Sequence, residues 1–261
     1  MLSLSALSPS ISFASVHVVG NLARSKTAKP GETFDGVILL KNTGAKSADV
    51  HIRQTDYQCY ADGRTLYGDP GTSARSNAKW ISVTPSHVTV PGNEMVSVNY
   101  KVRVPSDAKL VGTYWSLIMV EPAAAPAPEV KGGKDEIAVG VQTVTRFGVQ
   151  IITEIGTTGN CALKVADKAL VNDNGKRALK LDFENTGERD MVPNVSIELY
   201  GQNGLSIGKF DAGRGRIFPG GSVRYHADLS AIPIGKYVAM VIADTGDDHV
   251  MGAQYELEIT N

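Results

Sequence analysis

The sequence predicts an all-β fold, organised as two tandem β-sandwich domains joined by a short hinge. The first observation is a stretch of period-two hydrophobicity at 137–155, whose odd positions are apolar or β-branched, as in a strand with one buried face. The second is a strand–turn–strand order that occurs twice along the chain. The third is the composition, because 27 glycines and 12 prolines in 261 residues are typical of short strands separated by turns.

The stretch at 137–155 reads I-A-V-G-V-Q-T-V-T-R-F-G-V-Q-I-I-T-E-I, and we expect it to form one continuous strand. At about 3.3 Å per residue such a strand would span roughly 60 Å, whereas a usual strand has about five or six residues. It can therefore serve one domain, continue toward a second, and offer part of its apolar face to another molecule. The preceding segment at 122–136 is rich in alanine, proline and glycine and predicts a loop.

Three short motifs occur in the same order in each half of the chain. They are N-T-G at 42–44 and 185–187, a P-G pair at 91–92 and 219–220, and G-x-Y at 112–114 and 235–237. Asparagine and glycine suit a turn with left-handed backbone, and each tyrosine is expected to pack its ring in a corner and bond its hydroxyl to backbone. The repeat predicts two immunoglobulin-like sandwiches.

We expect a leader at 1–14, a first domain at 15–155 and a second domain at 156–261. The leader is rich in serine and leucine, and two interpretations stay open for it: the end of a trimmed secretion signal at Ser12-Phe13-Ala14, or a disordered extension. The polar segment Gly156-Thr157-Thr158-Gly159-Asn160 is short enough to restrict the angle between the domains.

Composition and motifs argue against several functions. The net charge of −1 does not favour nucleic acid or an anionic membrane as partner, and no apolar run reaches the ~18 residues of a transmembrane helix. Cys59 and Cys161 are expected to be unpaired thiols in different domains, without the spacing of a metal or redox site. The triplet D-T-G at 244–246 has no second copy to supply a paired carboxylate, so it predicts a turn. We expect no metal, no cofactor and no enzymatic activity.

With two sandwiches and the long strand in place, the chain resembles the periplasmic pilus chaperones, the PapD-like family. The resemblance rests on T-P-S-H-V-T-V-P-G at 84–92, G-T-Y-W-S-L-I-M-V-E-P at 112–122, and I-A-V-G-V-Q-T-V-T-R-F at 137–147, in that order. It covers the first domain best. Gly112-Thr113 depart from the family's usual wording, and the second domain is similar in architecture only.

In that family the strand after the loop lends alternating apolar residues to an incomplete pilin subunit. The resemblance implies that Ile137, Val139 and Val141 are the lent residues, with Thr143 continuing the row. It also implies that Arg146 holds the terminal carboxylate of the subunit, together with a cation on the first strand. That cation is either Arg24 or Lys26, and the sequence does not choose between them.

Elementary physics supports the same interpretation, because an apolar edge strand beside a loop favours pairing with another chain. We therefore expect a non-enzymatic, chaperone-like protein, periplasmic or secreted to the cell surface. It would bind an extended segment of a pilin-like or surface subunit by β-strand addition, with self-association through the same edge as a further expectation. The alternative is a structural or adhesion module of the cell surface, in which the tandem sandwiches act as spacers.

Overall fold

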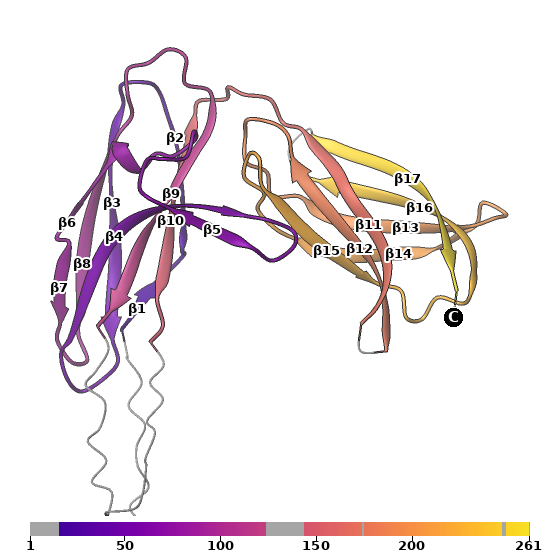
Figure 1. The fold of residues 1–261 in the computed structure, drawn as a ribbon, viewed down its shortest axis with the longest axis horizontal. Coiled ribbons are helices and arrows are strands. Elements are labelled where there is room, and N and C mark those ends of the chain that lie inside the picture. The colour runs from indigo at the N-terminus through magenta and orange to yellow at the C-terminus, as the bar shows by residue number, and fades with distance from the viewer. Residues whose placement is uncertain (1–15, 124–143, 174, 247–248, 261) are drawn as a thin grey trace, which may run out of the picture.

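The computed structural model describes residues 16–123, 144–173, 175–246 and 249–260. Figure 1 shows two elongated β-sandwiches set at an angle and joined at one end, like the arms of an elbow. The leader expected at 1–14 lies outside the described residues. Within the described part of the chain, no helix is long and apolar enough to cross a membrane.

The first domain consists of two facing sheets. One sheet has the order β1 (Val16–Val19), β3 (Thr33–Asn42), β8 (Met95–Arg103) and β6 (Ile81–Thr84). The other has the order β2 (Ala23–Ala28), β10 (Phe147–Ile155), β9 (Gly112–Pro122), β4 (Ala48–Cys59) and β5 (Thr65–Gly68), and β7 (His87–Val90) also pairs with β4. A single 3₁₀ turn, η1 (Ala78–Trp80), precedes β6 in the described chain.

Alternation along these strands builds the core of the first domain. On β3, Ile38 and Leu40 are fully buried, while Val37 and Leu39 at the alternate positions are exposed, as period-two geometry requires. Facing residues of β8, β9 and β10 close the same core: Val98, Val102, Ile118, Val120, Val149 and Ile151.

The second domain repeats this plan. A sheet of β11 (Leu163–Asp173), β12 (Lys176–Asn185) and β15 (Ser222–Asp228) faces a sheet of β14 (Ser206–Arg214), β13 (Asn194–Gly201), β16 (Gly235–Asp244) and β17 (Val250–Ile259). Its core includes Leu181, Ile197, Leu199 and Ile259, all fully buried. The all-β prediction is therefore confirmed, with two sandwiches in tandem, whereas the residue boundaries 15–155 and 156–261 stay a prediction.

The two N-T-G turns are equivalent, although the expected left-handed backbone is wrong for them. In each turn a fully buried asparagine donates to two carbonyl oxygens: Asn42 to Lys46 and Val90, and Asn185 to Arg189 and Ile217. The same asparagine accepts from the glycine amide two residues on, so each forms an Asx turn. Glycine is needed at position 187 because the backbone there lies close to the backbone of Asn160. A Cβ at this position would lie 2.6 Å from the Asn160 carbonyl oxygen.

The tyrosine of each G-x-Y motif takes a different role. Tyr237 fits the expected corner, since its hydroxyl donates to the Pro233 carbonyl oxygen at 2.9 Å. Tyr114 instead packs against Trp80, with ring centroids 4.7 Å apart, and beneath the Arg75 guanidinium. The repeated motif fixes the position of the ring in the strand order but not the partner of its hydroxyl.

The single strand expected over 137–155 is corrected in its described part, because β10 begins at Phe147 and residues 144–146 are not in a strand. The register explains this limit. Phe147 lies opposite Val120 of β9, so residue 145 would face Pro122, which has no N–H to extend the ladder. The stretch 137–143 lies outside the described residues.

The joint between the domains is a close backbone contact. A Cβ on Gly112 would lie 2.1 Å from the Glu188 carbonyl oxygen, and one on Gly159 would lie 2.8 Å from the Gly112 Cα. Beside them the Thr113 amide donates to the Glu188 carbonyl oxygen at 2.9 Å, and the Thr113 hydroxyl donates to the Asp190 carboxylate at 2.9 Å. The short hinge therefore does restrict the angle, with backbone packed against backbone.

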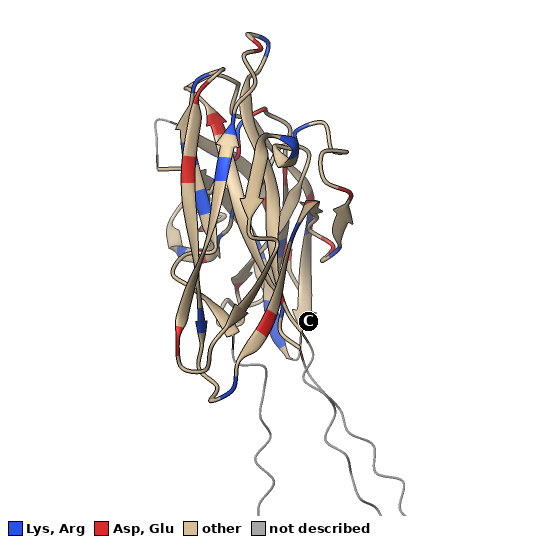
Figure 2. Cartoon of the chain, turned by 90° about the vertical axis from the view of Figure 1, so that its left-hand side faces the viewer, with Lys and Arg blue, Asp and Glu red and all other residues tan. Residues whose placement is uncertain are grey.

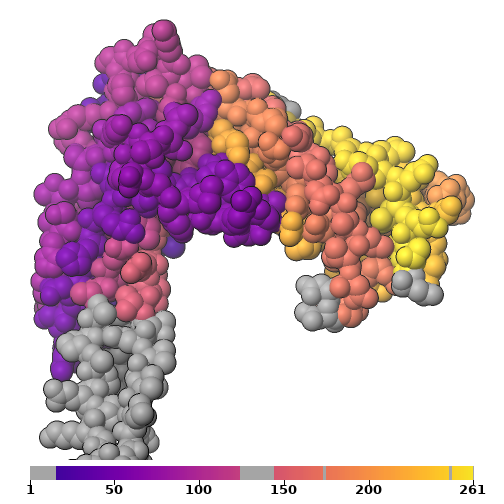
Figure 3. Space-filling model, in the orientation of Figure 1, coloured from indigo at the N-terminus to yellow at the C-terminus, as the bar shows by residue number. Residues whose placement is uncertain are grey.

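An aromatic contact supports the joint on its inner side. Phe218 of the second domain stacks on Trp115 with centroids 4.6 Å apart and meets Tyr57 edge to face at 5.8 Å. The hairpin formed by β4 and β5, dark purple in Figure 3, reaches across the elbow. There Gln58 and the Ala61 amide donate to the Pro219 carbonyl oxygen and the Ser222 hydroxyl.

Candidate functional site

The candidate site is the outer edge of β10, which is covered along only part of its length. β2 pairs with it in parallel from Gln150, opposite Ala23, to Ile155, opposite Ala28. The Gln150 amide donates to the Leu22 carbonyl oxygen at 2.7 Å, and the pairing ends there. Among the described residues, no strand covers the β2 side of β10 from Phe147 to Val149, so this part of the edge is open to a further strand.

Arg146 lies directly before this open edge. Its guanidinium is 3.9 Å from the Glu121 carboxylate, and its side chain is 64% exposed. Glu121 is bound more tightly by Arg53 of β4, through two hydrogen bonds of 2.9 and 3.0 Å. The bonds from Arg53, helped by its charge and by the charge of Arg146, lower the pKa of Glu121 against the opposing effect of burial. Arg146 is thus loosely held and retains donors for a second carboxylate.

Arg24 and Lys26 lie farther along the same edge. In the register of β2 and β10, Arg24 is opposite Ile151 and Lys26 is opposite Thr153. Five residues of strand, about 16 Å, separate the level of Arg24 from that of Arg146. Paired residues share a face, so Arg24 lies on the core side with Ile151, whereas Arg146 lies with Glu121 on the other side. The structure does not bring either candidate cation together with Arg146.

Arg24 nevertheless has an unusual environment. Its Nε is buried and has no hydrogen-bond partner among the described residues, and its charge acts on the hydroxyl of Tyr100 in the facing sheet. Burial raises the pKa of Tyr100, and the nearby cation partly offsets that rise. Arg24 therefore lies beside Tyr100 at the margin between the two sheets, and not on the face that carries Arg146.

The apolar residues assigned to strand donation, Ile137, Val139, Val141 and Thr143, lie outside the described residues. Their role stays a prediction. What the structure describes is the strand β10, which begins after them at Phe147, with Val149, Ile151 and Ile155 buried in the core of the first domain.

A second apolar surface was missed by the sequence reasoning. The side chains of Trp115, Leu117 and Met119 point away from the core, onto the face that meets the second domain, and all three are buried. Gly148 of β10 makes room for two of them, because a Cβ there would lie 3.3 Å from Leu117 and 3.4 Å from the Met119 sulfur. The signal was the apolar run at 115–120, interrupted only by Ser116, which indicates a strand buried on both faces.

Asp56 was another residue whose role the sequence did not reveal. It is buried, and its carboxylate accepts from the amides of Gly71, Thr72 and Ser73 and from the Ser76 hydroxyl. This arrangement organises the loop after β5. Asp56, Asp62 and Asp69 do not have the spacing of a calcium-binding loop. In the described chain, no group of three or more histidine, cysteine, aspartate or glutamate residues is placed to hold a metal ion.

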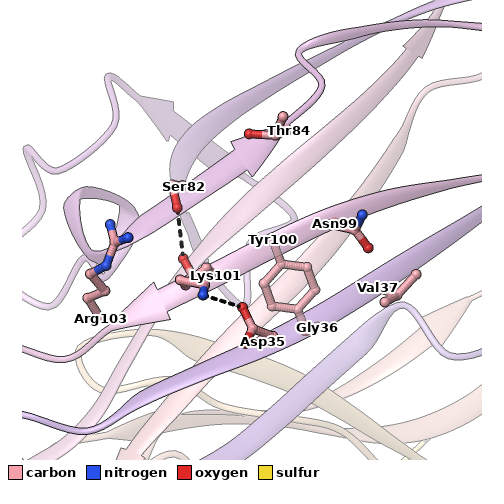
Figure 4. Close-up of a pocket in the computed structure, with 9 residues that line it drawn as sticks. All are labelled: Asp35, Gly36, Val37, Ser82, Thr84, Asn99, Tyr100, Lys101 and Arg103. Carbon is pink, nitrogen blue, oxygen red and sulfur yellow. Dashed lines mark hydrogen bonds and ion pairs between the residues drawn. The ribbon is translucent and has the colours of Figure 1, made fainter.

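A hollow elsewhere on the surface has a single carboxylate among the residues that line it. The hollow in Figure 4, of about 350 Å³, lies on the sheet of β3, β6 and β8. Its one carboxylate, Asp35, is paired with Lys101 at 3.2 Å, and Lys101 also accepts a bond from Ser82 through its carbonyl oxygen. Because the one carboxylate of this hollow is already paired with a lysine, we interpret the pair as structural.

Charge is mixed over the molecule. Figure 2 shows basic and acidic residues interspersed along the strands of the face turned to the viewer. Cys59 and Cys161 are each half-buried and form no disulfide. The triplet at 244–246 lies in the turn between β16 and β17, where the Gly246 amide donates to Asp244, as the sequence predicts.

Comparisons with known proteins relate the fold to one group. No family model matches the sequence, and no curated protein matches it. The structure is similar to the class 5 fimbriae chaperone CfaA, with 10% identity, 94% of this chain and 100% of that chain covered, and a TM-score of 0.50. A chain of a chaperone–tip adhesin complex of CFA/I fimbriae is 12% identical, with 93% of this chain and 98% of that chain covered and a TM-score of 0.49. A chain of the Salmonella enterica SafA pilin–SafB chaperone complex is 15% identical, with 95% of this chain and 99% of that chain covered and a TM-score of 0.46.

At 10% identity, the likeness to CfaA is a likeness of fold, and it spans both domains. It confirms the prediction of two tandem immunoglobulin-like sandwiches joined by a short hinge. The chain has the two-domain fold of the PapD-like fimbrial chaperones.

Proposed function

We propose that this protein is a non-enzymatic, chaperone-like protein that binds an extended segment of a protein partner by β-strand addition to the open edge of β10. The observation that carries the proposal is the half-covered edge. β2 pairs with residues 150–155 and stops, so the backbone ahead of Gln150 has a pairing partner only on the β9 side in the described chain. Main-chain hydrogen bonds along such an edge provide affinity for any extended chain.

The fold supports a partner of the fimbrial kind. A protein whose name describes a fimbriae chaperone has the same two-domain arrangement, and a pilin-like or surface subunit is the partner that this function implies. The same function implies a periplasmic or cell-surface location. Apolar side chains at alternate positions, led by Ile137, Val139 and Val141 with Thr143, would cover the core of the partner.

Arg146 is the residue that we assign to a terminal carboxylate of the partner. Its exposed guanidinium lies at the start of the open edge, and its present ion pair with Glu121 is long. A charge-assisted bond of ~1.5–3 kcal/mol would also fix where the incoming strand stops. The register argues against Arg24 or Lys26 as a second ligand of the same carboxylate.

A peptide experiment tests this assignment. The probe is a labelled peptide of alternating valine and threonine with a free C-terminal carboxylate, compared with its C-terminal amide and with a scrambled, proline-containing peptide. We expect the free acid to bind the full-length protein at least about tenfold more tightly than the amide, by fluorescence anisotropy. Hydrogen exchange should then slow at 147–149, and change little at 150–155, which β2 already covers.

Arg146→Glu should abolish the preference for the free acid while leaving the fold intact. Arg103→Glu is the matched control, because Arg103 is an exposed arginine on the other sheet of the same domain. Equal binding of the alternating and scrambled peptides would reject strand addition and favour the spacer function. Binding with an unchanged acid preference in the Arg146 variant would reject only the carboxylate assignment.

A further inference from the structure

The second domain has an open edge of its own, on β17. This strand, yellow in Figure 1, runs along the outer margin of the second domain. It pairs with β16 over ten residues, from Val250 opposite Asp244 to Ile259 opposite Gly235. On its other side, none of the described strands pairs with it.

The side chains beneath this edge are incompletely covered. Met251, Tyr255 and Leu257 point toward the core of the second domain but remain partly exposed. A cavity of about 120 Å³ lies between β17 and β11 of the facing sheet, and it reaches the buried Leu179 and Ala239. Lys168 crosses its mouth with its ammonium 4.3 Å from the centre of the Tyr255 ring. The margin therefore has apolar surface to bury along with free backbone groups.

β17 also lacks the features that protect the other edges of the molecule. The edge strands β1, β5, β6 and β7 are four residues long. β2 and β15 carry arginine or lysine, and β11 and β14 carry lysine together with a break in register. The sequence of β17, V-M-G-A-Q-Y-E-L-E-I, contains no lysine, arginine or proline, and its register is unbroken. Short strands, basic residues, proline and bulges are the means by which native edges avoid pairing.

We infer that β17 pairs antiparallel with β17 of a second copy of this chain, with Gln254 on the two-fold axis. The register is self-complementary, because on the core side Met251 meets Leu257 and Ala253 meets Tyr255 of the other copy. On the outer side the two glutamates meet uncharged residues: Glu256 lies opposite Gly252, and Glu258 lies opposite Val250. No like charges face each other directly, and nine residues of each strand are paired.

The resulting dimer has a continuous sheet across the two second domains. An isologous contact closes on itself, so pairing of this kind would stop at the dimer and not continue into a fibre. The contact is one strand wide and narrower than the interface of a permanent dimer, so we expect a dissociation constant in the micromolar range. This inference does not depend on the peptide site of the first domain, which lies at the other arm of the elbow.

A charge exchange at Gln254 tests the pairing and its register. Gln254 is exposed on the outer side of β17, so replacing it does not disturb the core. In the full-length protein, Gln254→Glu should raise the dissociation constant of the dimer about fivefold or more, because two carboxylates then face each other. Gln254→Lys should raise it less, since Glu256 of the other copy lies diagonally opposite. An equimolar mixture of the two variants should restore the dimer, as measured by analytical ultracentrifugation at low salt.

Gln202→Glu and Gln202→Lys are the matched controls, because Gln202 is an exposed glutamine in the turn between β13 and β14. They should leave the dissociation constant unchanged. A wild-type protein that stays monomeric up to about 300 µM, well above a micromolar dissociation constant, would overturn the inference. Single variants that dimerise as the wild type does would overturn it as well, as would a mixture that fails to recover.

Discussion

The last strands of the two domains occupy the same place in their sheets, but their outer edges are covered to different extents. β10 pairs with β9 and is covered by β2 over residues 150–155, whereas β17 pairs with β16 and is left open by the described strands. The difference arises earlier in each domain. After β1 the chain crosses to the other sheet through Gly20, whose φ of 87° suits a sharp change of direction, while β11 stays on β12 throughout.

This contrast shows that strand order and edge protection are separate properties. The repeated motifs at 42–44 and 185–187 give both domains the same turn and the same buried asparagine. The crossing of the first strand is present in one domain only, and it decides how much of the final strand remains available. Two domains with the same strand order and similar cores can therefore differ in how much of the edge of the final strand is exposed.

The largest effect on stability is expected from a substitution at the contact through which each domain stabilises the other. Phe218→Ala removes a buried ring that packs on Trp115 and Tyr57 across the joint, and should cost about 3 kcal/mol of unfolding free energy. Differential scanning calorimetry should show one cooperative transition in the wild type and two in the variant. Leu205→Ala, at a leucine that is 65% exposed, is the control and should change little. A single unshifted transition in both proteins would show that the domains do not stabilise each other here.

A smaller effect tests whether the two turns are equivalent. Asn42→Ala and Asn185→Ala each leave two backbone carbonyl oxygens without their donor, so each should cost about 2 kcal/mol. The measurement is urea unfolding, with Asn203→Ala in an exposed turn as control. The comparison of the domains would fail if one asparagine cost several times more than the other.

The smallest effect on stability is expected at Glu121, which pairs with Arg53 and Arg146 beside the open edge of β10. The strand β17 has no arginine or lysine in a corresponding place. Glu121→Gln should lower stability at pH 7 by roughly 0.5–1 kcal/mol, because its partner Arg53 is half exposed. The folded pKa of Glu121 is lowered, so the stabilisation is present above the ordinary carboxyl pKa and is lost as pH falls through the lowered value. Once the pH has fallen below that lowered pKa, the wild type and the variant should have the same stability.

Urea unfolding at pH 7 and at pH 3 measures this convergence. Asp62→Asn is the control, since Asp62 pairs with Arg64 on an exposed turn and should have no measurable effect on stability. A difference between wild type and Glu121→Gln that persists at pH 3 would assign the effect to packing and not to charge.

The fold could be predicted from local chemistry, while the candidate site could be predicted only in part. Alternation at 147–155 and the repeated turn motifs predict strands and turns, because period-two burial and Asx-turn hydrogen bonds are patterns of a few neighbouring residues. The limit of β10 at Phe147 depends on Pro122 in another strand, and the pairing of Arg53 with Glu121 depends on the register of β4 and β9. Nothing local to Arg24 or Lys26 shows that their levels on β10 lie about 16 and 23 Å, respectively, from that of Arg146.

The contact of Gly112, Gly159 and the Glu188 carbonyl oxygen has a mechanical consequence. The backbones of the two domains are in direct contact here. A side chain at either glycine would clash with the opposite backbone and force the domains apart. The angle between the domains is therefore set by this backbone contact, and a larger residue at Gly112 or Gly159 is expected to change it.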